Sequence, residues 1–143
     1  MDFLIADNAH FTIEHSYDCA LPGYLIVSPK VTVTSIHELP RQHLGQLGFT
    51  LATAIETIHS IIKPRKVYCA QFGELGTELH FHLFPRTAAI TEAFLRAFPE
   101  QAELIHGPVL LDWARSEYHS SREELWPVVS ETISMMRKHL NRD

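Results

Sequence analysis

The sequence predicts an α+β protein that forms a single domain. Stretches with alternating or β-branched residues come first, one long helical stripe interrupts them, and helical patterns fill the rest of the chain. With 143 residues, of which 45% are hydrophobic, the chain is long enough to bury one core. Because no repeat or linker divides it, we expect residues 1–143 to fold as one unit.

The first strands are expected before residue 35. Residues 10–15 (HFTIEH) partly alternate between polar and apolar side chains, which favours a strand. The turn signal Leu-Pro-Gly at 21–23 leads into a short apolar strand at 24–27. The run VTVT at 31–34 is rich in β-branched residues and predicts another strand.

A long amphipathic helix follows these strands. From Leu44 to Ile62, apolar residues recur at intervals of three and four, which is typical of a helix with one apolar face. Pro40 lies near the expected start, and Pro64 lies just beyond the expected end.

A second group of strands is expected after the long helix. Residues 66–71 (KVYCAQ) predict one strand, and the turn-like segment FGELGT follows. Residues 78–84 predict a second strand, which Pro85 should end. Because only a few residues, including two glycines, separate the strands, the sequence favours a hairpin.

The remainder of the chain predicts helices. Ile90, Phe94 and Phe98 mark a short helix, and residues 109–118 predict another. The segment 121–124 (SREE) fits a capping box at the start of a closing helix. The apolar stripe of this helix consists of Leu125, Val129, Ile133, Met136 and Leu140.

Composition excludes several classes of function. A net charge of −5 and a pI near 6.0 disfavour a broad surface for nucleic-acid backbone. No apolar run approaches the roughly 20 residues that a membrane helix needs, and the first residues lack the pattern of a signal peptide. Cys19 and Cys69 lack CxxC spacing. We therefore expect a cytoplasmic protein without nucleic-acid or membrane partners.

The segment ELHFHLFPR, residues 78–86, concentrates the titratable chemistry of the chain. Because side chains alternate along a strand, Glu78, His80 and His82 are expected on one face, and the apolar residues between them on the other. Three ionisable groups so closely spaced are unusual for an ordinary solvated surface.

Three interpretations of this segment remain open from the residues alone. The histidine pair can be structural, or Glu78, His80 and His82 can supply three metal ligands. The third interpretation is a phosphate site, because Arg86 is unfavourable beside a dication and useful beside a phosphate. The histidines at 15, 37 and 43 are expected at the surface or at helix starts.

The segment also resembles the signature of the histidine-triad (HIT) family, His-φ-His-φ-His-φ-φ, which Pro-Arg often follows. In this alignment His80 is the middle histidine, His82 is the third, and Glu78 occupies the first position. Residues 22–39, PGYLIVSPKVTVTSIHEL, are similar to the family pattern PGhhLVxPKxHVTSLxDL. The order of long helix, hairpin and signature is also that of the family.

The resemblance covers roughly residues 10–87 and leaves 88–143 as a C-terminal helical extension. It implies a HIT-like antiparallel sheet, a homodimer in which Arg41–Ile62 makes one contact, and hydrolysis or transfer of a nucleotide. The substrate would be a nucleotide or a dinucleoside polyphosphate, and the covalent step would need no metal or cofactor.

The resemblance also implies roles for individual residues. His80 would attack the α-phosphate and form a nucleotidyl-histidine, as suits a neutral imidazole. His82 would bond phosphate oxygens, and Glu78 would orient a histidine or replace the missing one. The residues expected to bind substrate are Gln71, Gly76, Thr77 and Arg86.

The chain departs from the family pattern at three places. Glu78 adds a carboxylate beside a phosphate site, Thr32 replaces the histidine of the PK-x-His-VTS segment, and the loop 72–77 is shorter than usual. Two alternative functions therefore stay open. One is a nucleotide-binding or interaction module with little turnover, and the other is a metal-dependent enzyme that uses Glu78, His80 and His82.

Overall fold

The computed structural model describes residues 1–74 and 76–141, and its elements confirm the predicted α+β class. The described strands form one antiparallel sheet in the order β1-β2-β3-β5-β4. Their bounds are β1 Leu4–Asp7, β2 Phe11–His15, β3 Leu25–Pro29, β4 Lys66–Ala70 and β5 Phe81–Arg86. The α-helices are α1 Arg41–Ile62, α2 Ala88–Ala97, α3 Gly107–Glu117 and α4 Trp126–Leu140, with short 3-10 turns at Ile36–Glu38, Pro99–Gln101 and Glu123–Leu125.

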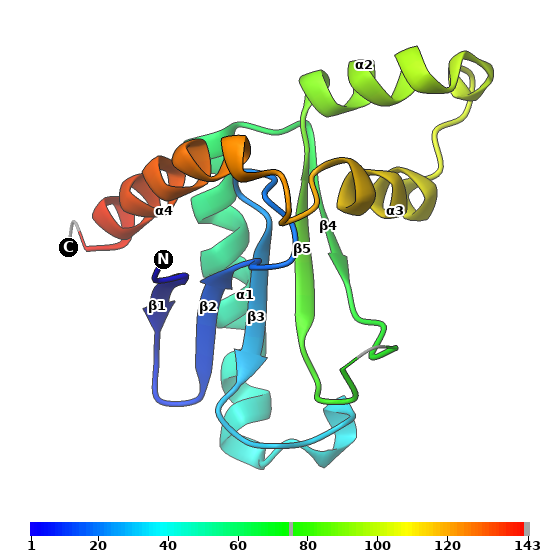
Figure 1. Ribbon diagram of the computed structural model, residues 1–143. Coiled ribbons are helices and arrows are strands. Elements are labelled where there is room, and N and C mark those ends of the chain that lie inside the picture. The colour runs from blue at the N-terminus through cyan, green and yellow to red at the C-terminus, as the bar shows by residue number, and fades with distance from the viewer. Residues whose placement is uncertain (75, 142–143) are drawn as a thin grey trace.

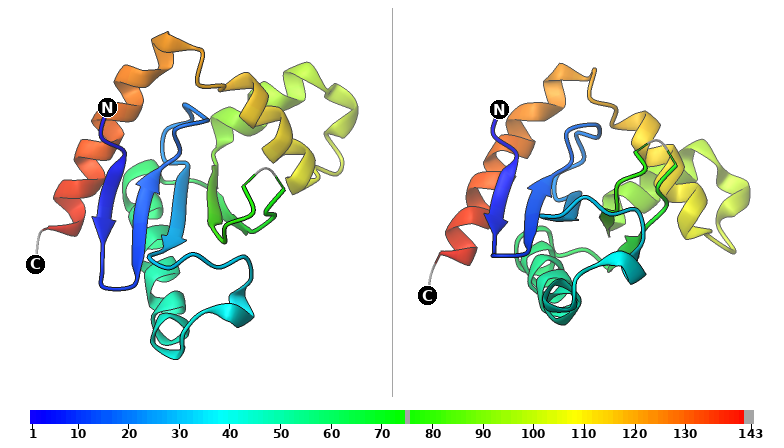
Figure 2. Two further views of the ribbon diagram at one scale, coloured as in Figure 1. Left: turned by 60° about the horizontal axis from the view of Figure 1, so that its bottom comes forward. Right: turned by 90° about the horizontal axis from the view of Figure 1, so that it is seen from below.

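The helices are distributed unevenly around the sheet. Helix α1 lies against one face and contacts β2, β3, β4 and β5, whereas α4 packs on α1 and β1 (Figure 1). Helices α2 and α3 pack on each other beside β4 and β5 (Figure 2). Much of the sheet face opposite α1 is therefore left without a covering helix.

Two hydrophobic clusters follow from this arrangement, and β5 contributes to both. Leu79, Phe81 and Leu83 are buried in the cluster that α1 and α4 cover. Phe84 points to the other face and is buried in the cluster under α2 and α3. The predicted alternation of apolar and polar side chains is therefore correct, because successive residues of a strand face opposite sides of the sheet.

Helix α1 confirms the longest helix prediction. It begins directly after Pro40 and ends at Ile62, where Lys63 adopts a left-handed conformation with φ of 55°. The fully buried positions of α1 are Thr50, Ala54, Thr57 and Ile58. Leu44, at the start of the predicted apolar stripe, is 43% exposed, so the stripe is wider than the face that the sheet covers. Phe49, which is outside that stripe, is 75% exposed.

The predicted turn at residues 21–23 positions the start of β3. Gly23 has a φ of +87°, and a Cβ atom at this position would lie 2.5 Å from Ile62 Cγ1. Only glycine combines this backbone conformation with so close an approach to α1. The turn directs Tyr24, which is 1% exposed, into the interior beside β5.

The N-terminal region differs from the prediction at two places. Residues 31–34 do not form a strand, because β3 ends at Pro29 and no strand pairs with them; Val33 O instead accepts a hydrogen bond from Leu79 N–H in the described segment before β5. Val31 and Val33 pack against the core instead. Sequence reasoning also missed β1, which pairs with β2 at the sheet edge.

The strand in the signature segment has other boundaries than the predicted strand at 78–84. Strand β5 begins at Phe81, and Glu78 to His80 precede it, because no neighbouring strand pairs upstream of Phe81. The connection from β4 is therefore longer than the predicted hairpin turn. Pro85 does not end the strand, since β3 pairs only as far as Leu83 and a residue without an N–H is tolerated where one side of a strand is open.

The predicted capping box is also wrong. Helix α4 begins at Trp126 and has Leu125 as its N-cap, without a side-chain capping bond. Residues 123–125 form a 3-10 turn, and the Ser121 hydroxyl lies 3.0 Å from His119 Nδ1. Within the described residues, none of the helices has the length and apolar character that crossing a membrane requires.

Candidate functional site

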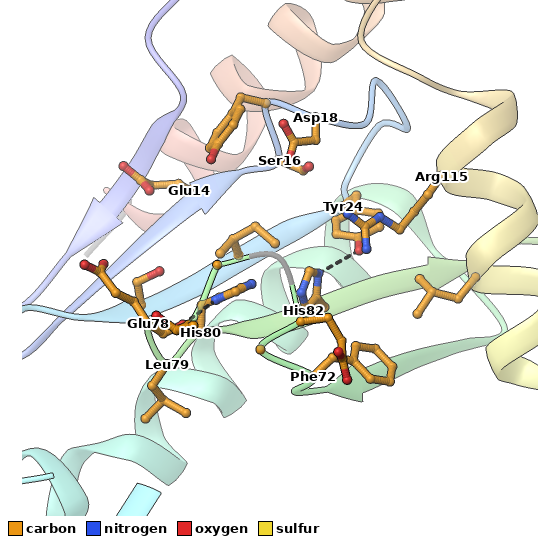
Figure 3. Close-up of a pocket in the computed structure, with 18 of the residues that line it drawn as sticks. Glu14, Ser16, Asp18, Tyr24, Phe72, Glu78, Leu79, His80, His82 and Arg115 are labelled. Atoms are coloured by element: carbon orange, nitrogen blue, oxygen red, sulfur yellow. Dashed lines mark hydrogen bonds between the residues drawn. The ribbon is translucent and has the colours of Figure 1, made fainter. Parts of the chain in front are cut away.

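A pocket of about 1050 Å³ opens on the sheet face opposite α1. Ile26, Ser28 and His82 line it, whereas their strand neighbours Leu25 and Leu83 are buried in the cluster under α1. The other walls come from residues 14–18 at the end of β2, residues 72–74 and 76–80 before β5, and helix α3 (Figure 3). The pocket therefore lies where the signature segment, the early strands and the C-terminal helices meet.

His80 is held by a backbone hydrogen bond at the pocket wall. Its Nδ1 lies 2.8 Å from the carbonyl oxygen of Glu78. Because a carbonyl oxygen only accepts, Nδ1 must carry the proton of this bond, and in the neutral ring the lone pair is on Nε2. This arrangement fixes the tautomer that a nucleophilic imidazole requires.

His82 lies next to His80, with their ring centroids 4.8 Å apart. It is 7% exposed, and its Nδ1 lies 2.8 Å from the Tyr24 hydroxyl. Burial, with smaller effects from His80 and Arg115, lowers the pKa of His82 to about 4. His82 is therefore neutral at pH 7.

The Tyr24 hydroxyl determines which nitrogen of His82 carries the proton. Burial raises the pKa of Tyr24 well above its usual range, so its O–H stays protonated and needs an acceptor. Nδ1 of His82 is the partner within hydrogen-bond distance. The hydroxyl therefore donates to Nδ1, and the proton of His82 is on Nε2, available as a donor.

We predict that Tyr24→Phe shifts the proton of neutral His82 from Nε2 toward Nδ1, because the buried hydroxyl that donates to Nδ1 is lost. Without the hydroxyl, Nδ1 can take the proton and Nε2 no longer donates. Nitrogen NMR of His82 reports the tautomer directly. Tyr68→Phe is the matched control, because the Tyr68 hydroxyl bonds Arg86 outside the pocket. An unchanged tautomer in Tyr24→Phe would contradict the assignment.

Glu78 contributes its backbone to the site. Its carbonyl oxygen orients His80, whereas its exposed carboxylate points away from the His80 ring (Figure 3). Any residue at position 78 supplies the same carbonyl. The departure from histidine at this position therefore leaves the orientation of His80 intact.

The expected substrate-binding residues do not all reach the pocket: Arg86 lies at the far end of β5, and Gln71 follows β4 near the start of β5. Gly76 and Thr77 line the pocket. Gln71 and Arg86, although both are described, do not line it. The Arg86 guanidinium donates to the Tyr68 hydroxyl at 3.1 Å and to Thr91 Oγ1 at 3.3 Å. Arg86 therefore ties β5 to β4 and α2.

Helix α3 supplies residues that sequence reasoning did not identify. Asp112 and Arg115 line the pocket from this helix. Their only sequence signal is their position beside the buried stripe of Leu110, Leu111 and Ala114. That stripe predicts a helix but does not say which face of the sheet it meets.

The charges around the pocket are strongly asymmetric. Among the described lining residues, Arg115 is the cation with a permanent charge. The carboxylates that line the same pocket are Glu14, Asp18, Glu74, Glu78 and Asp112. A phosphate in this pocket is therefore favoured near Arg115 and disfavoured near the carboxylates.

The structure also bears on the metal interpretation. Across residues 1–74 and 76–141, no three His, Cys, Asp or Glu side chains converge as a metal site would require. Glu78, His80 and His82 do not form such a group, because the Glu78 carboxylate turns away from the histidines (Figure 3).

The fold is that of histidine-triad proteins, as comparison with solved structures shows. A hypothetical histidine triad nucleotide-binding protein of Sulfolobus tokodaii matches with a TM-score of 0.66 and 14% identity, over 99% of this chain and 87% of that one. A Hit-like protein of Bartonella henselae, described as involved in cell-cycle regulation and solved with an unknown ligand, matches with a TM-score of 0.62 and 12% identity, over 96% of this chain and 86% of that one.

A third match covers less of each chain. A histidine triad protein of Bradyrhizobium japonicum has a TM-score of 0.55 and 23% identity, over 60% of this chain and 64% of that one. No protein-family model and no curated protein matches the sequence. The first two matches include the C-terminal helices, which the sequence resemblance left outside.

Proposed function

We propose that this chain is a HIT-family hydrolase or nucleotidyl transferase that acts at the α-phosphate of a nucleotide or dinucleoside polyphosphate. The observation that carries the proposal is the bond from His80 Nδ1 to the Glu78 carbonyl oxygen, which leaves the Nε2 lone pair free to attack. Nε2 forms a bond to phosphorus while the bond to the leaving group breaks, and the leaving group departs with the electron pair.

The resulting nucleotidyl-histidine then reacts with water or another acceptor. The acceptor oxygen bonds to phosphorus, the P–N electron pair returns to His80 Nε2, and the acceptor proton passes to solvent. Throughout the cycle His80 Nδ1 keeps its proton and its bond to the Glu78 carbonyl. A leaving phosphate needs no proton, so a neutral His82 can serve by hydrogen bonding alone.

Three donors support charge stabilisation at the α-phosphate. They are the Nε2–H of His82, the hydroxyl of Thr77 and the backbone N–H of Gly76, all of which belong to residues that line the pocket. Donors aimed at the phosphate oxygens stabilise the charge that develops during attack.

Intact-mass measurement after brief incubation tests the proposal. We would use adenine and guanine nucleotides and dinucleoside polyphosphates, and quench each reaction early. The expected result is a protein whose mass has increased by one nucleoside monophosphate, together with free nucleotide product. Neither adduct nor product with any of these substrates would overturn the proposal.

A nucleotide-binding module with little turnover is the second candidate. The carboxylates that line the pocket favour low turnover, because they repel the negative charge that develops on the phosphate oxygens during attack. Binding without product would select this candidate. Metal analysis of the purified protein, with activity measured before and after chelation, tests the metal-dependent alternative.

The homodimer that the resemblance implies is part of the same proposal, with α1 as one contact. Two observations support it: Phe49 is 75% exposed, and Gly45 and Gly48 beside it have open space in front of them. Large exposed apolar side chains beside small residues allow a second helix to approach closely.

We predict that Phe49→Glu raises the dimer dissociation constant by roughly 100-fold or more, because it places a charge where an aromatic ring would be buried. Sedimentation velocity at micromolar concentration measures the change. Met135→Glu is the matched control, because Met135 is an exposed apolar residue on α4. A wild-type protein that sediments only as a monomer would count against the dimer.

A further inference from the structure

Arg115 reaches the pocket from a helix outside the signature region. Its side chain extends from α3 toward the paired Tyr24 and His82 (Figure 3). Its positive charge acts on both of these groups: it adds to the lowering of the His82 pKa and offsets part of the rise that burial causes in the Tyr24 pKa. The guanidinium therefore lies within electrostatic range of the histidine pair.

Arg115 has no carboxylate partner among the described residues. Among the residues that the structure describes, the basic side chains that form ion pairs within 4.0 Å are Lys30, Arg122, Arg137 and His139. Arg115 is partly buried, and burying a guanidinium without a counter-charge is unfavourable. An anion in the pocket would supply the missing charge and accept the forked N–H donors.

The contacts around the histidines show on which side of the pair Arg115 lies. His80 is next to His82, His82 bonds Tyr24, and Arg115 acts on His82 and Tyr24. The carboxylates of Glu14 and Glu78 lie on the other side of His80 (Figure 3). Arg115 therefore places a permanent cation at the His82 end, where Asp18 and Asp112 also line the pocket. The labelled charged residues beyond His80, Glu14 and Glu78, are both carboxylates.

In-line attack places the nucleophile and the leaving group on opposite sides of the phosphorus. With His80 as nucleophile, a charged leaving group is repelled from the acidic end and can extend past His82. The nucleoside, whose hydroxyls can donate to carboxylates, suits the acidic end.

We propose that Arg115 binds the phosphate that leaves, so that the pocket selects substrates with a phosphate leaving group over those with an amine leaving group. This inference rests on the proposed function of His80. It assigns α3, which lies outside the signature, a direct role in substrate choice.

The test compares Arg115→Met with the wild type on two substrates that share the attacked phosphate. The leaving group of diadenosine triphosphate is a nucleoside diphosphate, which departs as an anion. The leaving group of adenosine 5′-phosphoramidate is ammonia, which departs once its nitrogen has taken a proton from solvent. We expect kcat/KM for diadenosine triphosphate to fall about 10- to 100-fold, mainly through KM, as for the loss of a hydrogen bond to a charged group. For the phosphoramidate we expect a change of less than about 3-fold.

Two variants control for charge and shape. Arg96→Met removes the same charge from an exposed position on α2 that does not line the pocket, and it should behave as wild type. Arg115→Lys keeps the charge without the forked donors and should show an intermediate loss. An equal loss on both substrates, or no loss, would overturn the proposal.

Binding of pyrophosphate in the His80→Ala background separates this inference from the proposed function. Calorimetry should show binding that Arg115→Met weakens about 10-fold or more, whether or not His80 is the nucleophile. Residual turnover in His80→Ala would instead count against the proposed function. Equal pyrophosphate affinity with and without Arg115, in variants with unchanged melting temperature, would overturn the role of Arg115.

Discussion

Replacing His80 by alanine is expected to lower kcat for nucleotide hydrolysis by at least ~10³-fold, on the scale of removing a covalent nucleophile. The loss should fall on kcat more than on KM, because His82, Thr77 and Arg115 remain in the pocket to bind phosphate. The nucleotidyl adduct should disappear together with the activity. Steady-state kinetics and intact mass on the same protein measure both effects.

Two further variants sharpen this result. His82→Ala removes a hydrogen-bond donor and leaves the attacking atom in place, so its loss should be milder than that of His80→Ala. His37→Ala removes an exposed histidine that does not line the pocket, and its activity should equal that of wild type. Comparable activity in His80→Ala and wild type would remove the nucleophile assignment.

The alternation of residues 78–84 was readable from sequence because it is a local property of an extended chain. Leu79, Phe81 and Leu83 had to face one side, and the structure buries all three under α1. The apolar stripe of α1 was readable for the same reason, since a helix repeats its faces every few residues. The alternation of residues 78–84 also predicted that His80 and His82 share the other face, and both line the pocket.

Contacts between segments that are distant in the sequence could not be predicted from the sequence. The sequence predicted α3 but could not place Arg115 against the pocket, because that position depends on how α2 and α3 pack beside β4 and β5. Arg86 was expected near a phosphate from its place in the signature, yet its guanidinium faces Tyr68 and Thr91. Its position in the sequence could not show which neighbours its long side chain would reach.

The contacts of backbone groups could not be predicted from the sequence either. The sequence assigned Glu78 a role through its carboxylate, whereas the structure uses its carbonyl to orient His80. The run at 31–34 had the composition of a strand but lacked a partner strand to pair with. β-propensity describes how a residue fits a sheet, and it cannot supply the neighbouring strand.

His15 and His82 make the stability of the fold dependent on pH. His15, which the sequence suggested was at the surface, is 0% exposed, and His82 is 7% exposed. His15 Nδ1 lies 2.8 Å from Ser16 O, and its Nε2 lies 3.1 Å from Leu21 O and 3.2 Å from Gly23 N. The two carbonyl contacts favour protons on the ring, but burial outweighs them and favours the neutral form, in which Nδ1 donates to Ser16 O and Nε2 accepts from Gly23 N–H.

Burial lowers the pKa of both histidines to about 4 from an ordinary value of 6.5. Between pH 4 and pH 6.5 these two histidines are protonated in the unfolded chain and neutral in the folded chain. The free energy of unfolding therefore rises with pH across this window and is flat with respect to these groups above it. The stability they contribute is present above pH 6.5 and is lost as the pH falls to about 4.

We predict that the loss is about 3 kcal/mol for each histidine, and thus roughly 6 kcal/mol for the two together between pH 6.5 and pH 4. A loss of this size is comparable to the whole stability of many small domains, so the protein should unfold in mild acid. Urea unfolding at intervals from pH 8 to pH 4.5 measures the slope. At pH 5 the slope should correspond to the uptake of nearly two protons on unfolding.

His82→Gln tests the assignment without depending on absolute stability. Glutamine can keep a hydrogen bond to the Tyr24 hydroxyl but does not titrate, so the slope at pH 5 should fall to about one proton. His15→Gln should reduce the slope by the same amount, even if the loss of its buried bonds destabilises the fold at every pH. Above pH 6.5 the curves of the variants should run parallel to that of the wild type. If removing either imidazole left the slope of the unfolding free energy at pH 5 unchanged, the proton taken up on unfolding would belong to another group. Burial of the neutral ring would then not be the cause of the acid sensitivity.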